Sequence, residues 1–532
     1  MKAKAGARTG AEALVESLER AGAEVVFGYP GANVVDVYER LQKAKFRFVL
    51  GRHEQGCTHM ADGYARATGR PGVVVVTSGP GATNAITGLT TANVDGVPLV
   101  LISGQVPLSQ IGTDAFQEAD MTGICRAATK HSFLVKSADE IPETVAQAFY
   151  IATHGKPGAV VIDVPKNVQE EMTAAQYPER ISLRAYHPEH AASTAEVNRF
   201  AKLLNEAKRP VLFAGGGVIA ANAAKDVAAL ARRANVPVAT TLMGIGSFDE
   251  GEALSLGLAG LYGTAAANEA IAAADLVIAL GVRFNDRVTG RDISHYVTKK
   301  KIVHVDCDPS SIDKNVSVGL GIVADVKDFL TTVNSRVKPA EHADWLKQVA
   351  KWKRADEAPS SRADGRGRGI LPRRIVESVY RATKGRAILV ADVGNHQMAC
   401  ARHFTHALPR HFLTSGGMGT MGFAIPAAIG AAIARPGEKV VAVVGDGGAQ
   451  MTFEELIVAV ELKLPVAFVV VNNGALGMVD TPISSPDFVK LARAYGVKGV
   501  RVAAGPRLDA AIARAVRARG PVLVEVKVGG EG

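Results

Sequence analysis

Cysteine is scarce in this chain. Its four cysteines show no CxxC pair; they are Cys57, Cys125, Cys307 and Cys400. This spacing fits neither a disulfide-rich secreted domain nor a cysteine-based zinc site, and it indicates reduced thiols in the cytoplasm. No apolar run reaches the ~18 residues of a membrane span, and the N-terminus lacks the apolar segment of a signal peptide. We therefore expect a cytoplasmic protein with no membrane partner.

Long runs of one charge are also absent. The formal net charge is +9, but Lys and Arg are dispersed, and the longest compact basic run is Lys299 to Lys301. Such a short run is typical of a solvated surface turn, so we expect no nucleic-acid partner. A dispersed positive balance suits small anionic substrates and cofactors.

Short apolar strands that alternate with helices are the main pattern present. The runs from Lys439 to Val444 and from Pro465 to Val471 lack polar alternation, which is typical of parallel strands covered on both faces. Between them, Thr452 followed by Glu455 fits a capping box at the start of a crossover helix. The same alternation recurs along the chain, and it predicts an α/β protein.

Polar residues follow both of these strands. Asp446 comes soon after the first and Asn473 after the second, so both lie at the sheet edge where ligands bind. A carboxylate and an amide oxygen suit Mg²⁺, which takes hard oxygen ligands. Gly447 and Gly448 lack side chains near the positive end of a helix, where a diphosphate can approach the backbone. The pattern predicts a site for a metal diphosphate.

The GDG sequence alone is equally typical of an ordinary βα turn. Here an Asn follows Asp446 after 473 − 446 = 27 positions. This combination resembles the thiamine diphosphate signature of the 2-oxo acid decarboxylase and carboligase superfamily. The resemblance implies thiamine diphosphate as cofactor and Asp446, Asn473 and Ala475 as ligands of Mg²⁺.

Longer stretches extend the resemblance over almost the whole chain. The family that they resemble most is the flavin-containing acetolactate (acetohydroxyacid) synthase catalytic subunit. The stretches are SGPGATN (78–84), GTDAFQEAD (112–120), TKHSFLV (129–135), TTLMGIG (240–246), GVRFNDRVTG (281–290), LTSGGMGTMGFAIPAAIGA (413–431) and PDFVKLARAYG (486–496).

This resemblance implies three doubly wound domains, each with a mainly parallel sheet. A pyrimidine-binding domain would occupy residues 1–170, a central FAD-binding-like domain 190–337, and a diphosphate- and Mg²⁺-binding domain 370–532. The polar stretches from Gln169 to His190 and from Lys338 to Gly369 would separate them.

Glu54 follows the predicted strand from Phe46 to Leu50 and begins a helix. Its carboxylate either stabilises the positive end of that helix by about 0.3–1 kcal/mol, or lies against the pyrimidine ring of the cofactor. A carboxyl group in a dry site suits proton sharing with that ring. The surrounding RHEQ matches the Glu motif of the superfamily, and the resemblance therefore favours catalysis.

Further contacts with thiamine diphosphate follow from the resemblance. It implies that the Gly419 carbonyl contacts the aminopyrimidine, that Met421 holds the cofactor bent and that Met478 lines the reaction face. Core packing is the alternative for both methionines. Asn395 and His396 occupy the positions of diphosphate contacts, with Asn395 where the family usually has Gln.

Three residues map to the family's substrate entrance and reaction chamber: Phe116, Gln117 and Lys130. Lys130 would attract the carboxylate of a 2-oxo acid such as pyruvate. A solvated surface lysine is the alternative for this residue type.

A glycine cluster follows an apolar run that begins at Pro210. It is not a GxGxxG motif, and by itself it favours a flexible turn. The resemblance implies a structural FAD there, without a redox step, although Lys156 replaces an Arg and Tyr262 a His of the family pattern. The implied FAD contacts are Gly215, Gly216, Gly217, Thr241, Leu242, Met243, Arg283, Arg287, Asp306 and Asp325.

The largest departure from the family follows Met478 and Val479. Related synthases continue there with RQWQ and a mobile segment of about twenty residues, whereas only DTPISS intervenes here. Such segments close over bound cofactor, so the deletion predicts a more open pocket. Asn33 also replaces a smaller residue near the expected reaction centre. Both departures favour decarboxylation over acetolactate synthesis.

Three hypotheses for the function remain open. The first is an acetolactate synthase-like carboligase that decarboxylates pyruvate and transfers the hydroxyethyl unit to a second 2-oxo acid, in branched-chain amino acid biosynthesis. The second is another thiamine diphosphate-dependent decarboxylase or aldehyde carboligase with a different acceptor. The third is a noncatalytic nucleotide-binding homologue. The resemblance implies a homodimer or homotetramer with shared active sites, in which Glu54 of one subunit faces the diphosphate site of another, and a possible regulatory subunit.

Overall fold

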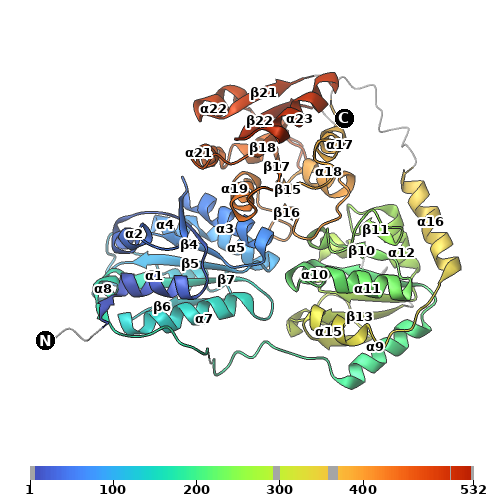
Figure 1. Ribbon diagram of the computed structural model, residues 1–532, viewed down its shortest axis with the longest axis horizontal. Helices are drawn as coiled ribbons and strands as arrows, with labels where there is room; N and C mark the ends of the chain where they lie inside the picture. The colour runs from blue at the N-terminus through green and yellow to red at the C-terminus, as the bar shows by residue number, and fades with distance from the viewer. Residues whose placement is uncertain (1–5, 182, 291–299, 358–369, 504, 529–532) are drawn as a thin grey trace.

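The computed structural model describes residues 6–528, except 182, 291–299, 358–369 and 504. In this part of the chain, three six-stranded parallel sheets are each flanked by helices (Figure 1). The fold is therefore α/β with three doubly wound units, as predicted. We call these units the first, central and last domains.

The first domain contains a fully buried strand, GVVVV at residues 72–76, as expected for a sheet covered on both faces. Its strands are β2 (Val25–Tyr29), β3 (Arg47–Leu50), β4 (Gly72–Val76), β5 (Leu99–Gln105), β6 (His131–Leu134) and β7 (Ala159–Pro165), and the short β1 (Arg8–Thr9) pairs with β8 (Met172–Thr173). Its helices are α1 (Gly10–Arg20), α2 (Val35–Leu41), α3 (Glu54–Thr68), α4 (Pro80–Asn84), α5 (Ile86–Asp95), α6 (Met121–Cys125), α7 (Ile141–Thr153) and α8 (Lys166–Glu170).

The last domain has a second buried sheet and a short antiparallel hairpin. Its sheet strands are β15 (Ile388–Ala391), β16 (Phe412–Thr414), β17 (Val440–Gly445), β18 (Val466–Asn472), β21 (Lys498–Val502) and β22 (Val522–Lys527), and the hairpin consists of β19 (Ala475–Leu476) and β20 (Thr481–Pro482). Its helices are α17 (Pro372–Thr383), α18 (Asn395–His403), α19 (Ala424–Ala434), α20 (Asp446–Ala449), α21 (Leu456–Glu461), α22 (Phe488–Ala494) and α23 (Leu508–Arg517).

The central domain lies beside the other two (Figure 1). Its strands are β9 (Pro210–Ala214), β10 (Val238–Thr240), β11 (Ser255–Leu258), β12 (Leu276–Leu280), β13 (Lys301–Asp306) and β14 (Leu320–Val323). Its helices are α9 (Thr194–Glu206), α10 (Gly216–Ala220), α11 (Ala224–Ala234), α12 (Ala265–Ala273), α13 (Asp286–Thr289), α15 (Val326–Val333) and α16 (Ala343–Glu357).

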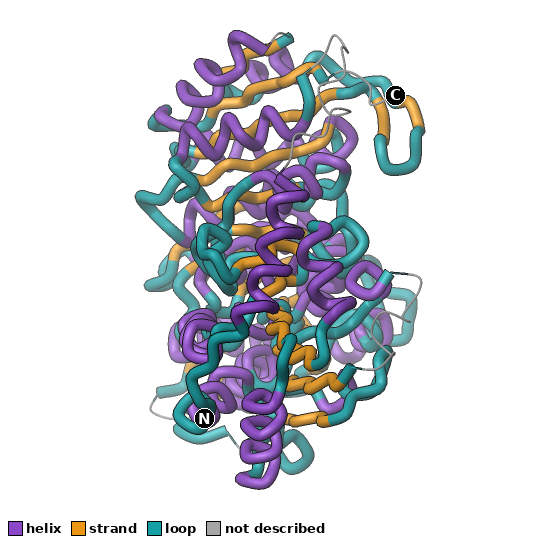
Figure 2. The backbone as a smooth tube through the Cα atoms, turned by 90° about the vertical axis from the view of Figure 1, so that its right-hand side faces the viewer, coloured by secondary structure: helices purple, strands orange, loops and turns teal. Residues whose placement is uncertain are grey.

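The strand order of each sheet reverses beside its first strand. The first and last sheets run β3-β2-β4-β5-β7-β6 and β16-β15-β17-β18-β22-β21, which is the same plan, and the central sheet runs β11-β10-β9-β12-β13-β14. Where the order reverses, neighbouring strands lead to opposite faces and a crevice opens beyond their carboxyl ends. These switch points lie between β2 and β4, between β9 and β12, and between β15 and β17. In the side view, strands lie between helices in the upper part of the molecule (Figure 2).

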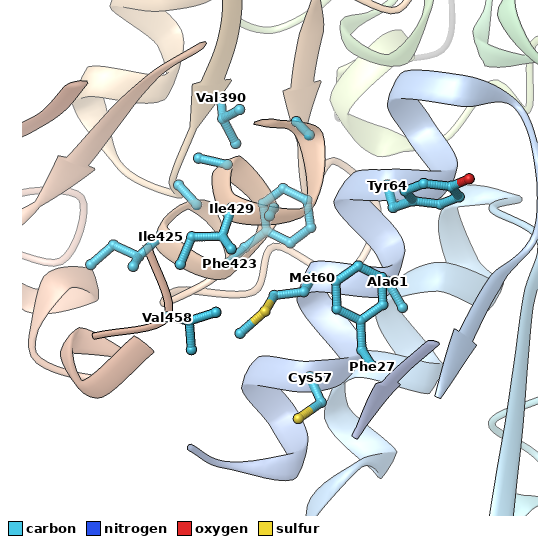
Figure 3. Close-up of a cluster of buried hydrophobic side chains, with 14 of the residues drawn as sticks. Phe27, Cys57, Met60, Ala61, Tyr64, Val390, Phe423, Ile425, Ile429 and Val458 are labelled. Carbon is cyan, nitrogen blue, oxygen red and sulfur yellow. The ribbon is translucent and has the colours of Figure 1, made fainter. Parts of the chain in front are cut away.

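The first and last domains share one hydrophobic core. Met60 and Phe27 of the first domain face Phe423 and Ile429 of the last (Figure 3). Helices α3 and α19 pack so closely that a Cβ added at Gly430 would lie 1.9 Å from the Met60 carbonyl oxygen. Only glycine allows this contact, because a side chain would force the two backbones apart.

The predicted capping box at Thr452 and Glu455 is wrong. The Thr452 side chain makes no cap hydrogen bond and donates instead to the Gly422 carbonyl. The Glu455 carboxylate accepts the backbone N–H groups of Arg52 and His53 from the first domain. For Glu455, the backbone N–H groups of the first domain therefore replace the local capping interaction with Thr452. The crossover between β17 and β18 is split into α20, a single 3₁₀ turn and α21.

Part of the stretch predicted to separate the central and last domains is structured. Residues 343–357 form α16, whose buried Trp345 packs on the central domain and donates its indole N–H to the Pro210 carbonyl at 3.1 Å. The rest of the stretch, 358–369, lies outside the described residues. Among the described helices, none combines the length and apolar character that a membrane crossing needs.

Replacing Gly430 with Ala tests the contact between α3 and α19. The added methyl group overlaps the Met60 carbonyl, so we expect a destabilisation of about 1–3 kcal/mol or more and a lower thermal unfolding midpoint. Gly520→Ala is the matched control, because a Cβ at Gly520 meets no atom within 4 Å. Equal midpoints for the two variants would contradict the close contact.

Candidate active site

The switch point of the last sheet gathers the residues predicted to bind the diphosphate. Asn395 and His396 begin the helix after β15, and Asp446 follows β17. His396 Nε2 accepts the Gly445 N–H at 3.1 Å and joins the two loops. Burial lowers the pKa of His396 to about 4, so the ring is neutral and its nitrogen is free to accept.

Asp446 is buried, and its carboxylate accepts hydrogen bonds from three segments of the last domain. Its Oδ1 accepts the Gly447 N–H at 3.1 Å, and its Oδ2 accepts the Gly474 N–H at 2.8 Å. The Ser485 hydroxyl also donates to Oδ2, at 3.0 Å. The carboxylate is therefore held in one orientation.

The three predicted metal ligands converge. One end of the Asn473 amide lies 3.3 Å from Asp446 Oδ1 and 2.8 Å from the Ala475 carbonyl oxygen. The Asn473 amide has two possible orientations. With its nitrogen at this place, it donates to Asp446 Oδ1 and to the Ala475 carbonyl. With its oxygen at this place, the three residues present three oxygens to one point. Such a cluster is the ligand set that a hard cation takes, so these residues fit Mg²⁺. Within the described residues, no group of three His, Cys, Asp or Glu side chains offers another metal site.

The two glycines after Asp446 differ in what surrounds them. A Cβ at Gly447 would lie 2.6 Å from Leu476 and 3.1 Å from the Met421 methyl group, which places Met421 beside the loop. A Cβ at Gly448 would instead lie 2.8 Å from the Asp392 carboxylate. Gly448 is thus required for packing on Asp392, and its predicted diphosphate contact stays a prediction.

Asp392, at the end of β15, is a residue that the sequence analysis missed. Its buried carboxylate accepts the N–H groups of Val393 at 2.7 Å and of Gly422 at 3.1 Å. Burial raises its pKa to about 7. An Asp directly after a buried strand was the available signal, but its partner Gly422 lies 30 residues away in the chain. It fixes the turn that precedes α19.

The turn that carries Gly419 is held by the first domain. The Asp95 carboxylate, at the end of α5, accepts the N–H groups of Gly416 at 3.1 Å and Gly417 at 2.7 Å. It also pairs with the buried Arg66 guanidinium at 2.9 Å. Gly419 itself has φ +68° and open space around its Cα, so its backbone is accessible. Asp95 was not predicted either.

Glu54 begins α3 beside the switch point of the first sheet. Asn84 Nδ2 donates to Glu54 Oε2 at 3.0 Å, which leaves Oε1 facing the glycine turn at Gly81. Gln117 lies over Gly79 of the same turn with φ +62°. Its Oε1 is buried without a hydrogen-bond partner among the described residues. The structure thus brings Glu54 and Gln117 to one turn.

Glu455 anchors the segment that leads into Glu54. Its buried carboxylate accepts the N–H groups of Arg52 at 3.1 Å and His53 at 3.0 Å. Burial raises the pKa of Glu455 to about 8. The last domain therefore fixes the start of α3, which carries Glu54.

Phe116 and Lys130 differ in their surroundings. The Phe116 side chain is 85% exposed. The Lys130 ammonium donates to the carbonyls of Ile151 and His154 and to the Tyr186 hydroxyl, at the C-terminus of α7. Burial lowers its pKa to about 8. Its three donors are thus engaged within the chain, and the predicted contact with a 2-oxo acid stays a prediction.

A cavity of about 600 Å³ lies at the switch point of the central sheet. It is large enough for a nucleotide cofactor, and it extends to the last domain. Lys156 and Tyr262, the two departures from the family pattern, also line it. Among the predicted contacts, its walls include Gly216, Gly217, Thr241, Leu242, Met243, Arg283, Arg287, Asp306, Asp325, Gly419 and Met478.

Some predicted FAD contacts also have structural roles. Gly215 and Gly217 allow close approach to Gly281, since a Cβ at either would lie within 2.6 Å of its backbone. The Asp325 carboxylate caps α15. The Arg283 guanidinium donates to the Val94 carbonyl of the first domain. These contacts fix the walls of the cavity.

Comparison with known proteins matches three successive family models. They are the N-terminal TPP binding domain of thiamine pyrophosphate enzymes over residues 8–124, the central domain over 197–333 and the C-terminal TPP binding domain over 392–526. The chain is also 43% identical to the acetolactate synthase large subunit of Haemophilus influenzae, over 98% of this chain and 94% of that protein. It belongs to the acetolactate synthase large-subunit family.

Other members of the family show the same extent of similarity. The chain is 42% identical to the acetolactate synthase isozyme 3 large subunit of Escherichia coli, over 98% of this chain and 95% of that protein. It is 41% identical to the mitochondrial acetolactate synthase catalytic subunit of Saccharomyces cerevisiae, over 98% of this chain and 80% of that protein. These matches confirm the predicted family and thiamine diphosphate, which is thiamine pyrophosphate under its other name.

Proposed function

We propose that this protein decarboxylates pyruvate with thiamine diphosphate and Mg²⁺ and transfers the two-carbon unit to a second 2-oxo acid, forming an acetolactate. The observation that carries this proposal is the convergence of the Asp446 carboxylate, the Asn473 side-chain amide and the Ala475 carbonyl at the switch point of the last sheet. The names of its relatives, which are acetolactate synthases, support it. The product would enter branched-chain amino acid biosynthesis in the cytoplasm.

The residues have separate roles in this proposal. Thiamine diphosphate, when bound, would supply a carbon nucleophile for the keto group of a 2-oxo acid. Asp446, Asn473 and Ala475 would hold the Mg²⁺ that accompanies it. Glu54 would exchange a proton with the pyrimidine ring through Oε1, because Asn84 occupies Oε2. Asn395 and His396 would contact the diphosphate.

A structural FAD in the central cavity is a further part of the proposal. The cavity volume and the cationic side chains of Lys156, Arg283 and Arg287 suit an anionic dinucleotide. Asp306, buried at the end of β13, suits a ribose hydroxyl. No redox step is assigned to the flavin.

We also propose that the complete site needs two chains. Arg66, near the end of α3, packs on Phe423. The adjacent Gly422 donates its N–H to Asp392, which follows β15 at the predicted diphosphate site. Glu54 is 66 − 54 = 12 residues away on the same helix, or about 18 Å along its axis. The Glu54 of a second copy would face the diphosphate site instead.

Exposed apolar side chains of the first domain support such an assembly, since a partner chain would cover them. They are Tyr29, Val35, Leu50 and Phe116. The assembly would be a homodimer or homotetramer. A separate regulatory subunit is part of the proposal because relatives are named large or catalytic subunits.

A second candidate is a decarboxylase or carboligase with another acceptor. It rests only on the departure from the family pattern after Val479, and the names of the relatives, which are acetolactate synthases, support the first candidate instead. A noncatalytic homologue is the remaining alternative, and the intact set of Glu54, Asp446 and Asn473 argues against it.

Product analysis separates these candidates. Purified protein incubated with pyruvate, thiamine diphosphate and Mg²⁺ should form acetolactate, and omission of the cofactor should abolish it. Acetaldehyde or acetoin alone would support the second candidate instead. No consumption of pyruvate at saturating cofactor would support the noncatalytic alternative.

Mixing two inactive variants tests both the role of Glu54 and the shared site. Glu54→Gln removes the proton exchange and should slow turnover at least about 100-fold, with cofactor binding retained. Asp446→Ala should abolish Mg²⁺-dependent binding. If subunits exchange at random into dimers, half are hybrids with one intact site each, so activity should recover to about a quarter of the wild-type level.

The exposed Glu206→Gln variant is the control for the substitution itself. Mixed variants that stay inactive although hybrids form, as shown by tagged subunits, would contradict the shared site. Unchanged turnover of Glu54→Gln would contradict its catalytic role.

A further inference from the structure

The segment that replaces the longer loop of related synthases forms an ordered hairpin. Ala475 pairs with Pro482 and Leu476 with Thr481 in antiparallel register. The Ile483 N–H then donates to the Gly474 carbonyl at 2.9 Å. The prediction of a more open pocket stays a prediction; the structure shows that the short segment is ordered and folds back toward the loop of Asp446.

The hairpin packs on the start of α20. A Cβ at Gly447 would lie 2.6 Å from the Leu476 side chain and 3.4 Å from that of Ile483. These apolar contacts bring the next turn of chain over the loop of Asp446. Ser485 is the residue that reaches it, with its hydroxyl 3.0 Å from Asp446 Oδ2.

The hydrogen bonds of Asp446 are unequal. Oδ2 accepts both the Gly474 N–H and the Ser485 O–H, which occupy its two lone pairs. Oδ1 accepts the N–H of the adjacent Gly447 and lies 3.3 Å from the end of the Asn473 side-chain amide that also faces the Ala475 carbonyl. When that end is the amide oxygen, Oδ1 keeps a free lone pair and is the carboxylate oxygen available to a cation.

We propose that Ser485 is a positioning residue that makes Asp446 a ligand through Oδ1 alone and thereby sets the preference for Mg²⁺ over Ca²⁺. This inference rests on the proposed function, because it concerns the cation of that site. Mg²⁺ requires a nearly octahedral shell, which a single carboxylate oxygen suits. Ca²⁺ has a larger and more flexible shell that accepts both oxygens of one carboxylate.

Removal of the Ser485 hydroxyl should therefore change the ratio of the affinities for Mg²⁺ and Ca²⁺. In Ser485→Ala, Oδ2 keeps only the Gly474 N–H, so one of its lone pairs becomes available to a cation that can take both carboxylate oxygens. A hydrogen bond to a charged group corresponds to about a tenfold effect on binding. We expect the affinity for Mg²⁺, measured with thiamine diphosphate present, to fall about tenfold, while the affinity for Ca²⁺ is retained or rises.

The measurement is a calorimetric titration of the full-length protein with MgCl₂ or CaCl₂ in the presence of thiamine diphosphate. Ser484→Ala is the matched control, because Ser484 is the exposed neighbour of Ser485 and should leave the ratio unchanged. Ser485→Thr keeps the hydroxyl and should restore the wild-type ratio.

The outcomes distinguish a failure of the role proposed for Ser485 from a failure of the proposed function. If Ser485→Ala and Ser484→Ala give the same Mg²⁺ to Ca²⁺ ratio, or if Ser485→Thr behaves like Ser485→Ala, the role of Ser485 is overturned and the proposed function stands. If the wild-type protein binds neither cation with thiamine diphosphate, the proposed function itself fails.

Discussion

Helices α3 and α19 touch backbone to backbone, and the positions of the other parts of the site depend on this contact. Gly63 of α3 lies against the Ala427 carbonyl of α19, and Gly430 of α19 lies against the Met60 carbonyl of α3. Neither helix can therefore slide along the other without breaking these two close contacts. The contact merges the cores of the first and last domains. It also sets Arg66 and Asp95 beside the turn that carries Gly419.

Buried carboxylates hold the loops around the site. Asp95 binds the turn at Gly416, Glu455 binds the segment before Glu54, and Asp392 binds the turn before α19. A buried carboxylate is costly unless it is hydrogen-bonded, so each one keeps its loop in place. The loops are thus held by hydrogen bonds within the protein itself, and such fixed loops are the preorganisation that catalysis requires.

The sequence allowed the fold, and the position of the proposed metal ligands at the strand ends, to be predicted because both depend on local sequence pattern. Buried parallel strands are continuous apolar runs, and their ligands follow directly at the strand ends, as for Asp446 and Asn473. The Thr452 and Glu455 capping box failed because Glu455 binds a segment some 400 residues earlier. Asp95 and Ser485 were missed for the same reason: their hydrogen-bond partners are set by the packing of distant elements, which hydrophobic periodicity does not report.

The central claim is that Asp446 Oδ1, the Asn473 amide oxygen and the Ala475 carbonyl hold the cation of the cofactor. The most direct measurement is anomalous diffraction from crystals grown with Mn²⁺ and thiamine diphosphate, since Mn²⁺ takes the same hard oxygen ligands as Mg²⁺. The account predicts one strong peak about 2.2 Å from these three oxygens, close to the distances of Mg²⁺. A peak elsewhere, or bound cofactor without a peak at this site, would contradict it.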